Sequence, residues 1–345
     1  MQPTGRPTVA LVVGDPAGIG PELAARLLAD PAAREAAALV AVGDARVLQE
    51  GAAVAGVGLD LPVETNPGAV RPGRDVLLDL RHLDPGTIAT GIASEAGGRF
   101  AVANFRTGLE LAAAGQVDAV CYTPFNKAAM HMAHPTYDDD TTFVNEVLQT
   151  DAPASEYPAS EYNVLDGLWN ARVTSHVPLS AVAGLITRER VGRALRMTDG
   201  ALRGAGFDRP RIAVAALNPH AGDGGNFGHE DDAIIRPAVM DAVAAGIAAE
   251  GPFPPDTVFV RARRGQFDAV LTMYHDQGQI AMKLLGFERG VTLLGGYPFP
   301  ICTPAHGSAY DIAGQGVADP GASRAALLLA ARMAAGVCTP ARFTS

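Results

Sequence analysis

Residues 9–32, VALVVGDPAGIGPELAARLLADPA, form the segment that is most informative about the fold. The apolar run Val9–Val13 is typical of a buried strand. A glycine-rich turn follows, and Pro21 and Glu22 suit the first turn of a helix, where proline needs no donor and the helix dipole favours a carboxylate. The segment therefore predicts a strand, a tight turn and a helix that ends near residue 32.

The same order of elements continues along the chain. Apolar runs that predict further strands lie at residues 37–42, 76–80, 117–122, 172–174, 211–217 and 267–273. Helical patterns lie at residues 93–114, 188–203, 231–249 and 323–335. Strands that alternate with helices predict an α/β fold with a largely parallel, doubly wound sheet. The near-repeat ASEY at residues 154–157 and 159–162 predicts a surface excursion or a small insertion.

Length and composition limit the possible classes of protein. The chain has 345 residues, 48% of them hydrophobic and 19% charged, which is typical of a globular protein with room for two domains. The net charge of −10 argues against a nucleic-acid partner. No apolar run reaches membrane length, and the first twenty residues do not resemble a secretory signal. Three scattered cysteines, at positions 121, 302 and 338, favour a reduced, cytoplasmic protein.

Three histidines lie in separate polar runs at the ends of predicted strands. They are His176 in TSHVPL (174–179), His220 in LNPHAG (217–222) and His275 in MYHDQG (273–278). Because strand ends of an α/β sheet converge on one crevice, three imidazoles there predict a site for a divalent metal with open positions for substrate. The alternative is that each histidine is an isolated polar residue whose ring is satisfied by the backbone.

The glycine-rich turn at residues 14–20 has a second possible role, beside a bound cofactor. Its glycine spacing differs from the dinucleotide-binding pattern, although Asp44 follows the second strand about where a ribose ligand is expected. The alternative is a tight turn followed by a helix cap.

A second glycine-rich stretch, HGSAYDIAGQGVADP at residues 306–320, resembles the adenosine-binding loop of the isopropylmalate and isocitrate dehydrogenases. Residues 14–22 also look like the corresponding segment of those enzymes. The resemblance implies two α/β domains that share a largely parallel sheet, with the active site in the cleft. It also implies that the side chain of Asp311 accepts hydrogen bonds from the adenosine ribose and that the preceding residues hold adenine: His306, Gly307, Ser308 and Ala309. A carboxylate at the ribose favours NAD over NADP, whose 2′-phosphate it would repel. The alternative is a glycine-rich loop in which Asp311 caps a helix.

The histidine runs single out one branch of that superfamily. The runs TSHVPL, LNPHAGDGGNFG (217–228) and YHDQG (274–278) resemble the 4-hydroxythreonine-4-phosphate dehydrogenase family, and the likeness extends over residues 12–320. It implies that His176, His220 and His275 bind a divalent metal at the interface of a homodimer. Imidazole ligands suit Zn²⁺ best, with Co²⁺, Ni²⁺, Mn²⁺ and Mg²⁺ as alternatives.

The activity implied by this resemblance is metal-dependent, NAD-linked oxidation of a secondary alcohol in a small hydroxy acid, with or without decarboxylation. Candidates for the general base are Asp256, Asp276 and Lys283. Lys127 follows a strand end in the Pro-x-x-Lys pattern of the family and is a candidate for substrate binding. Either lysine could instead be a solvated surface charge.

The chain departs from the family pattern at three positions of the substrate pocket. Asp140 stands where the family has histidine, with Thr141 retained, and Thr292 and Ile301 replace asparagine and arginine. Each lost charge-assisted contact to a phosphate would cost about 1.5–3 kcal/mol. We therefore expect Asp140, Thr141, Thr292, Lys127 and Lys283 to contact a different substrate of a catabolic pathway, such as threonate or erythronate 4-phosphate or a cis-dihydrodiol.

The expected domains are residues 1–130 with 300–345, and residues 131–299, which carry the histidines. Two functions of other classes remain open. One is a non-catalytic relative that binds metal or nucleotide. The other is a phosphate-acetyltransferase-like enzyme, which shares a related architecture and needs no tris-histidine site.

Overall fold

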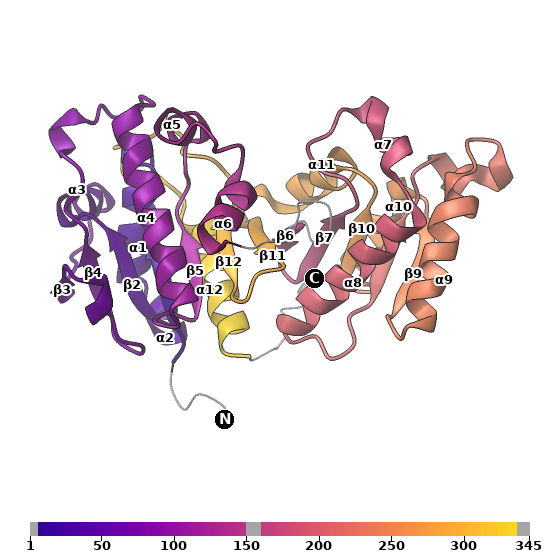
Figure 1. Ribbon diagram of the computed structural model, residues 1–345, viewed down its shortest axis with the longest axis horizontal. Helices are drawn as coiled ribbons and strands as arrows, with labels where there is room; N and C mark the ends of the chain where they lie inside the picture. The colour runs from indigo at the N-terminus through magenta and orange to yellow at the C-terminus, as the bar shows by residue number, and fades with distance from the viewer. Residues whose placement is uncertain (1–5, 150–159, 337–345) are drawn as a thin grey trace. The chain divides into compact units, whose positions relative to one another are not determined.

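The computed structural model describes residues 6–149 and 160–336, and within them the chain folds into two compact α/β units (Figure 1). The first unit is built from residues 6–149 and 297–335, and the second from residues 160–296. The chain thus leaves the first unit and returns to it. Each unit has strands with helices packed on them, and each is described by itself.

The strands of the first unit follow the order β3-β4-β2-β1-β5-β12, and every neighbouring pair is parallel. The central strands are buried along their whole length, which explains their continuous apolar runs. The strands are β1 (Thr8–Val12), β2 (Ala38–Gly43), β3 (Val63–Glu64), β4 (Val76–Asp79), β5 (Ala119–Tyr122) and β12 (Ile301–Pro304).

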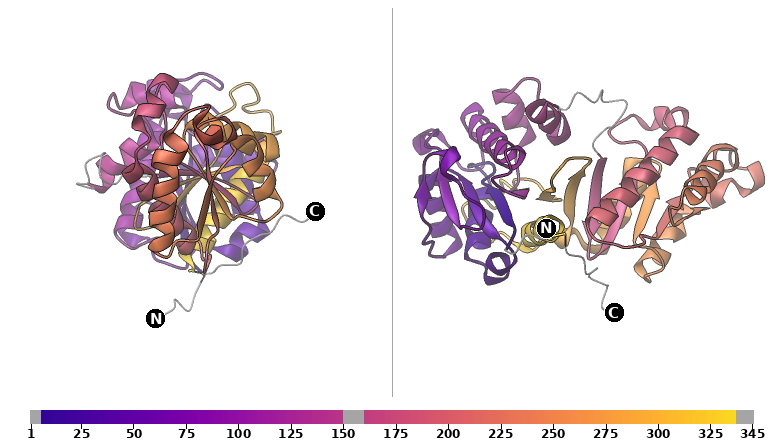
Figure 2. Two further views of the ribbon diagram at one scale, coloured as in Figure 1. Left: turned by 90° about the vertical axis from the view of Figure 1, so that its right-hand side faces the viewer. Right: turned by 60° about the horizontal axis from the view of Figure 1, so that its bottom comes forward.

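The helices of this unit form two groups, and Figure 2 shows strands between them. One group is α1 (Gly20–Ala29), α2 (Pro31–Ala36), α3 (Ala45–Ala55) and α12 (Gly321–Ala334). The other is α4 (Glu95–Ala113), α5 (Lys127–Ala133) and α6 (Asp140–Leu148), and two short 3₁₀ turns lie at Pro67–Ala69 and Pro85–Thr87. Helix α4 approaches β1 closely at Gly108, where an added Cβ would lie 2.6 Å from Val12 Cγ2. Glycine is therefore required for this packing.

The strands of the second unit follow the order β11-β6-β7-β10-β8-β9. Strand β6 is antiparallel to both of its neighbours, whereas β7, β10, β8 and β9 are parallel. The strands are β6 (Ser160–Leu165), β7 (Leu168–Arg172), β8 (Ile212–Ala215), β9 (Ala249–Phe253), β10 (Ala269–Thr272) and β11 (Val291–Gly295). A hairpin turn at Asp166 and Gly167, both with positive φ, joins β6 to β7.

The helices of the second unit also pack in two groups. Helix α8 (Arg188–Gly204) contacts α9 (Arg236–Ala244), whereas α10 (Pro255–Arg263) and α11 (His275–Gly286) build a core with β8 and β10 around Val258, Val270 and Met282. The remaining elements are α7 (Leu179–Leu185), 3₁₀ turns at Pro219–Gly225 and Phe287–Arg289, and a π turn at Asp231–Ile235.

The predicted α/β class with largely parallel strands is confirmed, and three local predictions are wrong. The strand expected at residues 172–174 is β7, which begins at Leu168 and ends at Arg172. The second ASEY copy enters β6 and is not an excursion, because the backbone of residues 160–162 pairs with β11; the first copy lies outside the described residues. The helix expected over residues 231–249 ends at Ala244, and β9 begins at Ala249. Helix α6 packs on α4 and belongs to the first unit. The domain limits, the shared sheet and the cleft location of the site stay predictions.

Candidate functional site

The three histidines lie beyond the carboxyl ends of three strands that are neighbours in the second unit. His176 follows β7, His220 lies in the turn after β8, and His275 begins α11 after β10. Because β7, β10 and β8 are adjacent and parallel, these ends share one edge of the sheet. The local placement expected from the sequence is therefore present.

Two of the predicted metal ligands lie side by side. The ring centroids of His176 and His275 are 5.5 Å apart. Asp276 Oδ1 lies 2.6 Å from His275 Nδ1, so a proton on that nitrogen is held by the carboxylate and Nε2 is left with the lone pair. This is the arrangement in which a carboxylate orients a metal-binding imidazole.

His220 is not part of the same cluster. Its ring lies 5.9 Å from that of Phe227. Within residues 6–149 and 160–336, no three His, Cys, Asp or Glu side chains form a group that could hold a metal ion. The structure thus brings together two imidazoles of the expected three, and the tris-histidine centre stays a prediction.

The backbone of the candidate segments is in an unusual conformation. Five of the eight described non-glycine residues with positive φ belong to them, namely His176 (50°), His220 (53°), Ala221 (56°), Asp223 (45°) and Ala309 (42°). The left-handed region of backbone conformation is energetically unfavourable for residues with a Cβ, and such residues are concentrated at functional sites. Residue pattern alone did not indicate this.

Two residues that the sequence analysis missed support the histidine turns. Asp231 is fully buried, and its carboxylate accepts hydrogen bonds from the amides of Leu217 (2.8 Å) and Asn218 (3.2 Å). The Gln277 side chain accepts a hydrogen bond from the Met273 amide and donates one to the Ala216 carbonyl, and each has a length of 2.7 Å. Gln277 therefore joins the end of β10, before His275, to the end of β8, before His220.

The candidate general bases are all exposed side chains of the second unit. Asp256 is in the first turn of α10, and Asp276 and Lys283 lie on α11. Asp276 and Lys283 are seven residues apart, so they share a helix face at a separation of about 10 Å along the axis. Asp276 already contacts His275. Their catalytic role stays a prediction.

The candidate substrate-binding residues are divided between the units. Lys127 is exposed at the start of α5, Asp140 and Thr141 begin α6, and Lys283 and Thr292 belong to the second unit. These roles are untested. Ile301, in contrast, is completely buried in β12, so its side chain does not line an open pocket.

Asp140 is held by tyrosines. Its Oδ2 accepts a hydrogen bond of 2.7 Å from the Tyr122 hydroxyl, and its Oδ1 accepts one from the Tyr137 hydroxyl. Both tyrosines are 2% exposed. The preceding residue, Asp139, caps α6 through the amide of Thr142. Two carboxylates therefore stand at the amino end of this helix, where they would repel a phosphate.

The two segments that resemble isopropylmalate dehydrogenase pack against each other in the first unit. The Ile19 amide donates to the Ser308 carbonyl over 3.0 Å. A Cβ at Gly18 would lie 2.6 Å from the same carbonyl oxygen, so the contact requires glycine there. Of the candidate cofactor residues, Ser308 is buried, His306 and Ala309 are partly buried, and Gly307 and Asp311 are exposed. The Asp311 side chain is thus available to a ligand.

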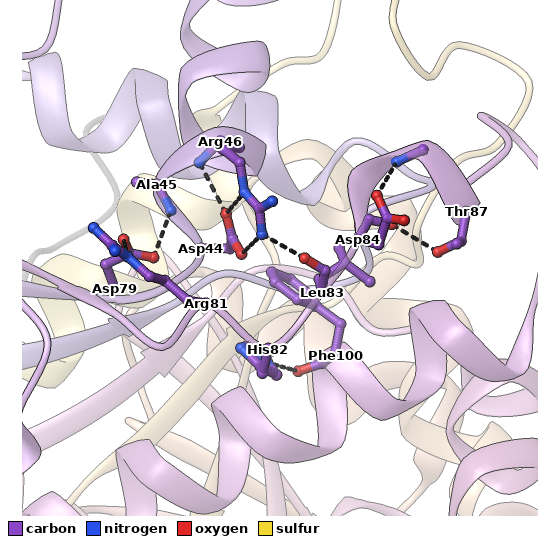
Figure 3. A network of polar contacts seen from close by, with 11 residues as sticks. Asp44, Ala45, Arg46, Asp79, Arg81, His82, Leu83, Asp84, Thr87 and Phe100 are labelled. Atoms are coloured by element: carbon purple, nitrogen blue, oxygen red, sulfur yellow. Dashed lines mark hydrogen bonds and ion pairs between the residues drawn. The ribbon is translucent and has the colours of Figure 1, made fainter.

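Asp44 has a structural role rather than the ribose-binding position considered from the sequence (Figure 3). Its side chain is fully buried, caps α3 at the Arg46 amide, and pairs with the Arg46 guanidinium through both oxygens. Burial by itself would raise the pKa of Asp44, but hydrogen bonds and the charge of Arg46 outweigh it, so the pKa is lowered. Asp79 similarly binds the Ala45 amide and Arg81. The network stabilises the ends of β2 and β4.

None of the helices in the two described ranges has the length and apolar character needed to span a bilayer.

Comparisons with known proteins agree with this architecture. The family model described as pyridoxal phosphate biosynthetic protein PdxA matches residues 35–330. A relative from Rhizobium meliloti (strain 1021), named "Putative 4-hydroxythreonine-4-phosphate dehydrogenase 2", is 57% identical over 331 residues, covering 95% of this chain and 94% of its own. The D-threonate 4-phosphate dehydrogenase of Pectobacterium atrosepticum is 37% identical over 329 residues, with 94% and 99% covered. The crystal structure of the 4-hydroxythreonine-4-phosphate dehydrogenase from Klebsiella pneumoniae is 34% identical, with a TM-score of 0.80 over 95% of this chain and 99% of that chain.

Proposed function

Because this chain belongs to the pyridoxal phosphate biosynthetic protein PdxA family, we propose that it is a metal-dependent, NAD-linked dehydrogenase of a small, phosphorylated hydroxy acid. The relatives reported above are all named dehydrogenases of hydroxylated substrates. The chain is accordingly an oxidoreductase that acts on a CH–OH group. The metal, the nucleotide and the identity of the acid belong to the proposal.

The observation that carries the metal proposal is the pair His176 and His275. Two imidazoles 5.5 Å apart, one of them oriented by Asp276, are a suitable donor set for Zn²⁺, and the alternatives are Co²⁺, Ni²⁺, Mn²⁺ and Mg²⁺. His220 would complete the set in the assembled homodimer. When bound, the metal would supply Lewis-acid polarisation of the substrate hydroxyl.

The residues of the chain would supply orientation and proton removal. Asp276 holds the proton on His275 Nδ1 and so keeps Nε2 in the form that can coordinate. Because Asp276 is engaged in this contact, we assign removal of the substrate hydroxyl proton to Asp256 or Lys283. The base that acts must lie within hydrogen-bond reach of the substrate hydroxyl.

NAD is the proposed hydride acceptor, and residues 306–311 would hold its adenosine. Small residues at Gly307, Ser308 and Ala309 allow close approach of the backbone to adenine, with His306 beside them. The exposed carboxylate of Asp311 would accept hydrogen bonds from both ribose hydroxyls. It would repel the 2′-phosphate of NADP.

For the substrate, we favour a sugar-acid phosphate such as threonate or erythronate 4-phosphate over 4-hydroxythreonine 4-phosphate. The reason is that Asp140, which accepts hydrogen bonds from Tyr122 and Tyr137, replaces the histidine that the resemblance implies in the pocket for 4-hydroxythreonine 4-phosphate. The phosphate of the substrate would therefore have to be bound by other residues. Thr141, Lys127, Lys283 and Thr292 would provide the remaining contacts. A cis-dihydrodiol is the alternative without a phosphate.

Assembly into a homodimer is supported by apolar side chains beside the histidine turns. They include Leu179 (71% exposed), Phe227 (50%), Ile280 (62%) and Leu284 (84%). Side chains of this kind are typical of a surface that a second copy covers. A cytoplasmic location, expected from the cysteine pattern, is part of the proposal.

The test combines metal binding with turnover. Metal-free protein is titrated with zinc, and NADH formation is followed with threonate 4-phosphate, erythronate 4-phosphate, 4-hydroxythreonine 4-phosphate and a cis-dihydrodiol. We expect zinc binding that weakens in H176A and H275A, and the highest kcat/KM with a sugar-acid phosphate. Carbon dioxide release shows whether decarboxylation follows.

Three outcomes contradict parts of the proposal. Binding of zinc and NAD without turnover of any of these compounds supports a non-catalytic relative. Absence of zinc binding together with acetyl transfer to phosphate supports the acetyltransferase-like alternative. Efficient oxidation of 4-hydroxythreonine 4-phosphate overturns the substrate preference.

A further inference from the structure

Asp15 and Tyr310 form a partly buried hydrogen bond between two segments that are 295 residues apart in the chain. Asp15 follows β1 in the glycine-rich turn and is 1% exposed. Its Oδ1 accepts a hydrogen bond of 2.9 Å from the Ala17 amide, and its Oδ2 accepts one from the Tyr310 hydroxyl. Tyr310 immediately precedes Asp311, the proposed ribose ligand.

The electrostatics of this pair make the contact hard to replace. Burial raises the pKa of Asp15, and the hydrogen bonds from Tyr310 and Ala17 oppose that rise. Burial and the bond to Asp15 raise the pKa of Tyr310 above its usual range, so its hydroxyl keeps the proton and donates it. Because the Asp15 carboxylate is 1% exposed, losing this donor would leave a buried charge with one hydrogen bond fewer.

The contact acts on a loop whose conformation is strained. Ala309 has a φ of 42°, which is unfavourable for alanine and persists only where the surroundings impose it. Neighbouring constraints are the bond from the Ile19 amide to the Ser308 carbonyl and the close approach of Gly91 to the Tyr310 carbonyl. The hydroxyl of Tyr310 adds a side-chain anchor between the strained residue and Asp311.

We propose that Asp15 and Tyr310 are positioning residues, which hold the His306–Asp311 loop in the conformation that binds the adenosine half of NAD. This inference rests on the proposed function of that loop. Neither residue is assigned a contact with the cofactor. Their effect should therefore appear in the affinity for NAD and not in the rate of the chemical step.

The test is Tyr310→Phe in the full-length protein, with the dissociation constant of NADH measured by fluorescence and the KM for NAD measured by turnover. Loss of a charge-assisted hydrogen bond predicts an increase of about tenfold in both constants with little change in kcat. Asp15→Asn, which can still accept from Ala17 and donate to Tyr310, should show a smaller increase.

Tyr297→Phe is the matched control. The Tyr297 hydroxyl also donates within the first unit, to the Thr141 carbonyl and to Asn145, and these partners belong to α6 and not to residues 306–311. Its loss should leave the NADH dissociation constant unchanged. Zinc affinity serves as a second control, because the candidate ligands lie in the other unit.

Two results would overturn the inference while wild-type protein binds NADH. One is an unchanged NADH dissociation constant in Tyr310→Phe. The other is a parallel weakening of NADH and zinc binding, which would indicate a general loss of structure. If wild-type protein does not bind NADH, the proposed function fails first and this inference fails with it, so the two failures are distinguishable.

Discussion

Replacing Gln277 by leucine would remove the side chain that joins the ends of β10 and β8. The amide of Met273 and the carbonyl of Ala216, each 2.7 Å from Gln277, would both lose their partner. Met273 and Ala216 are fully buried, and an unsatisfied buried polar group costs about 1–3 kcal/mol. The free energy of unfolding of the metal-free protein should therefore fall by about 2 kcal/mol or more.

The same change should affect the proposed metal ligands, because His275 and His220 follow the two strand ends that Gln277 connects. Loss of a supporting contact behind a metal ligand typically weakens binding by about 10–100-fold. We therefore expect a zinc dissociation constant at least about tenfold higher in the leucine variant. Isothermal titration of the metal-free protein measures it, and urea unfolding measures the stability.

Gln279→Leu is the control for this prediction. Gln279 lies two residues further along α11, and its side chain makes no hydrogen bond with the described residues. The substitution therefore removes no such bond. Its unfolding free energy and zinc affinity should remain close to wild type. If the two leucine variants have equal stability and equal zinc affinity, the reasoning about Gln277 is refuted.

Three further predictions concern single side chains. Asp311→Asn should raise the KM for NAD by about tenfold and reduce the discrimination against NADP, measured as the ratio of kcat/KM values; an unchanged ratio would contradict the ribose assignment. Asp140→His should increase kcat/KM for 4-hydroxythreonine 4-phosphate, since it restores the histidine of the family pattern and removes a carboxylate that would repel the phosphate; an unchanged kcat/KM for this compound would count against the assignment of Asp140 to the substrate pocket. Arg46→Met should lower the unfolding free energy at pH 7, because the buried Asp44 loses its charged partner. Because the pKa of Asp44 is lower in the folded state, its ionised form stabilises the folded protein above the unfolded pKa of about 4, and this contribution is lost as the pH falls through the folded pKa. The difference in unfolding free energy between wild type and Arg46→Met should therefore shrink in acid. An exposed pair such as Arg99 with Glu95 should contribute less than about 0.5 kcal/mol at either pH.

Several features of the fold could be predicted because they depend on local pattern. A run such as Val9–Val13 is apolar at every position, which is typical of a strand buried on both faces. Pro21 and Glu22 mark a helix start by their own chemistry. Strand β6 was missed because it begins with the polar residues Ser160 and Glu161 and so lacks a continuous apolar run, although Asp166 and Gly167 form a strong hairpin signal after it.

The candidate site could be predicted only in part. The positions of His176, His220 and His275 at strand ends follow from alternation of elements along the chain. Which imidazoles approach one another depends on the path of each turn after its strand. The chain around His220 has several residues in the left-handed conformation. The residue types of that turn do not determine the direction of the His220 ring.

The sequence by itself determined that this protein is an α/β enzyme with polar, histidine-bearing turns after its strands, because strand burial and helix capping are encoded within a few neighbouring residues. Only the tertiary structure decided that His176 meets His275, that Asp44 is a buried cap, and that Asp15 bonds to Tyr310. Such contacts join residues that the order of the strands and the packing of the helices bring close together. The energy of each contact depends on how deeply it is buried, and no single segment of the sequence specifies that burial.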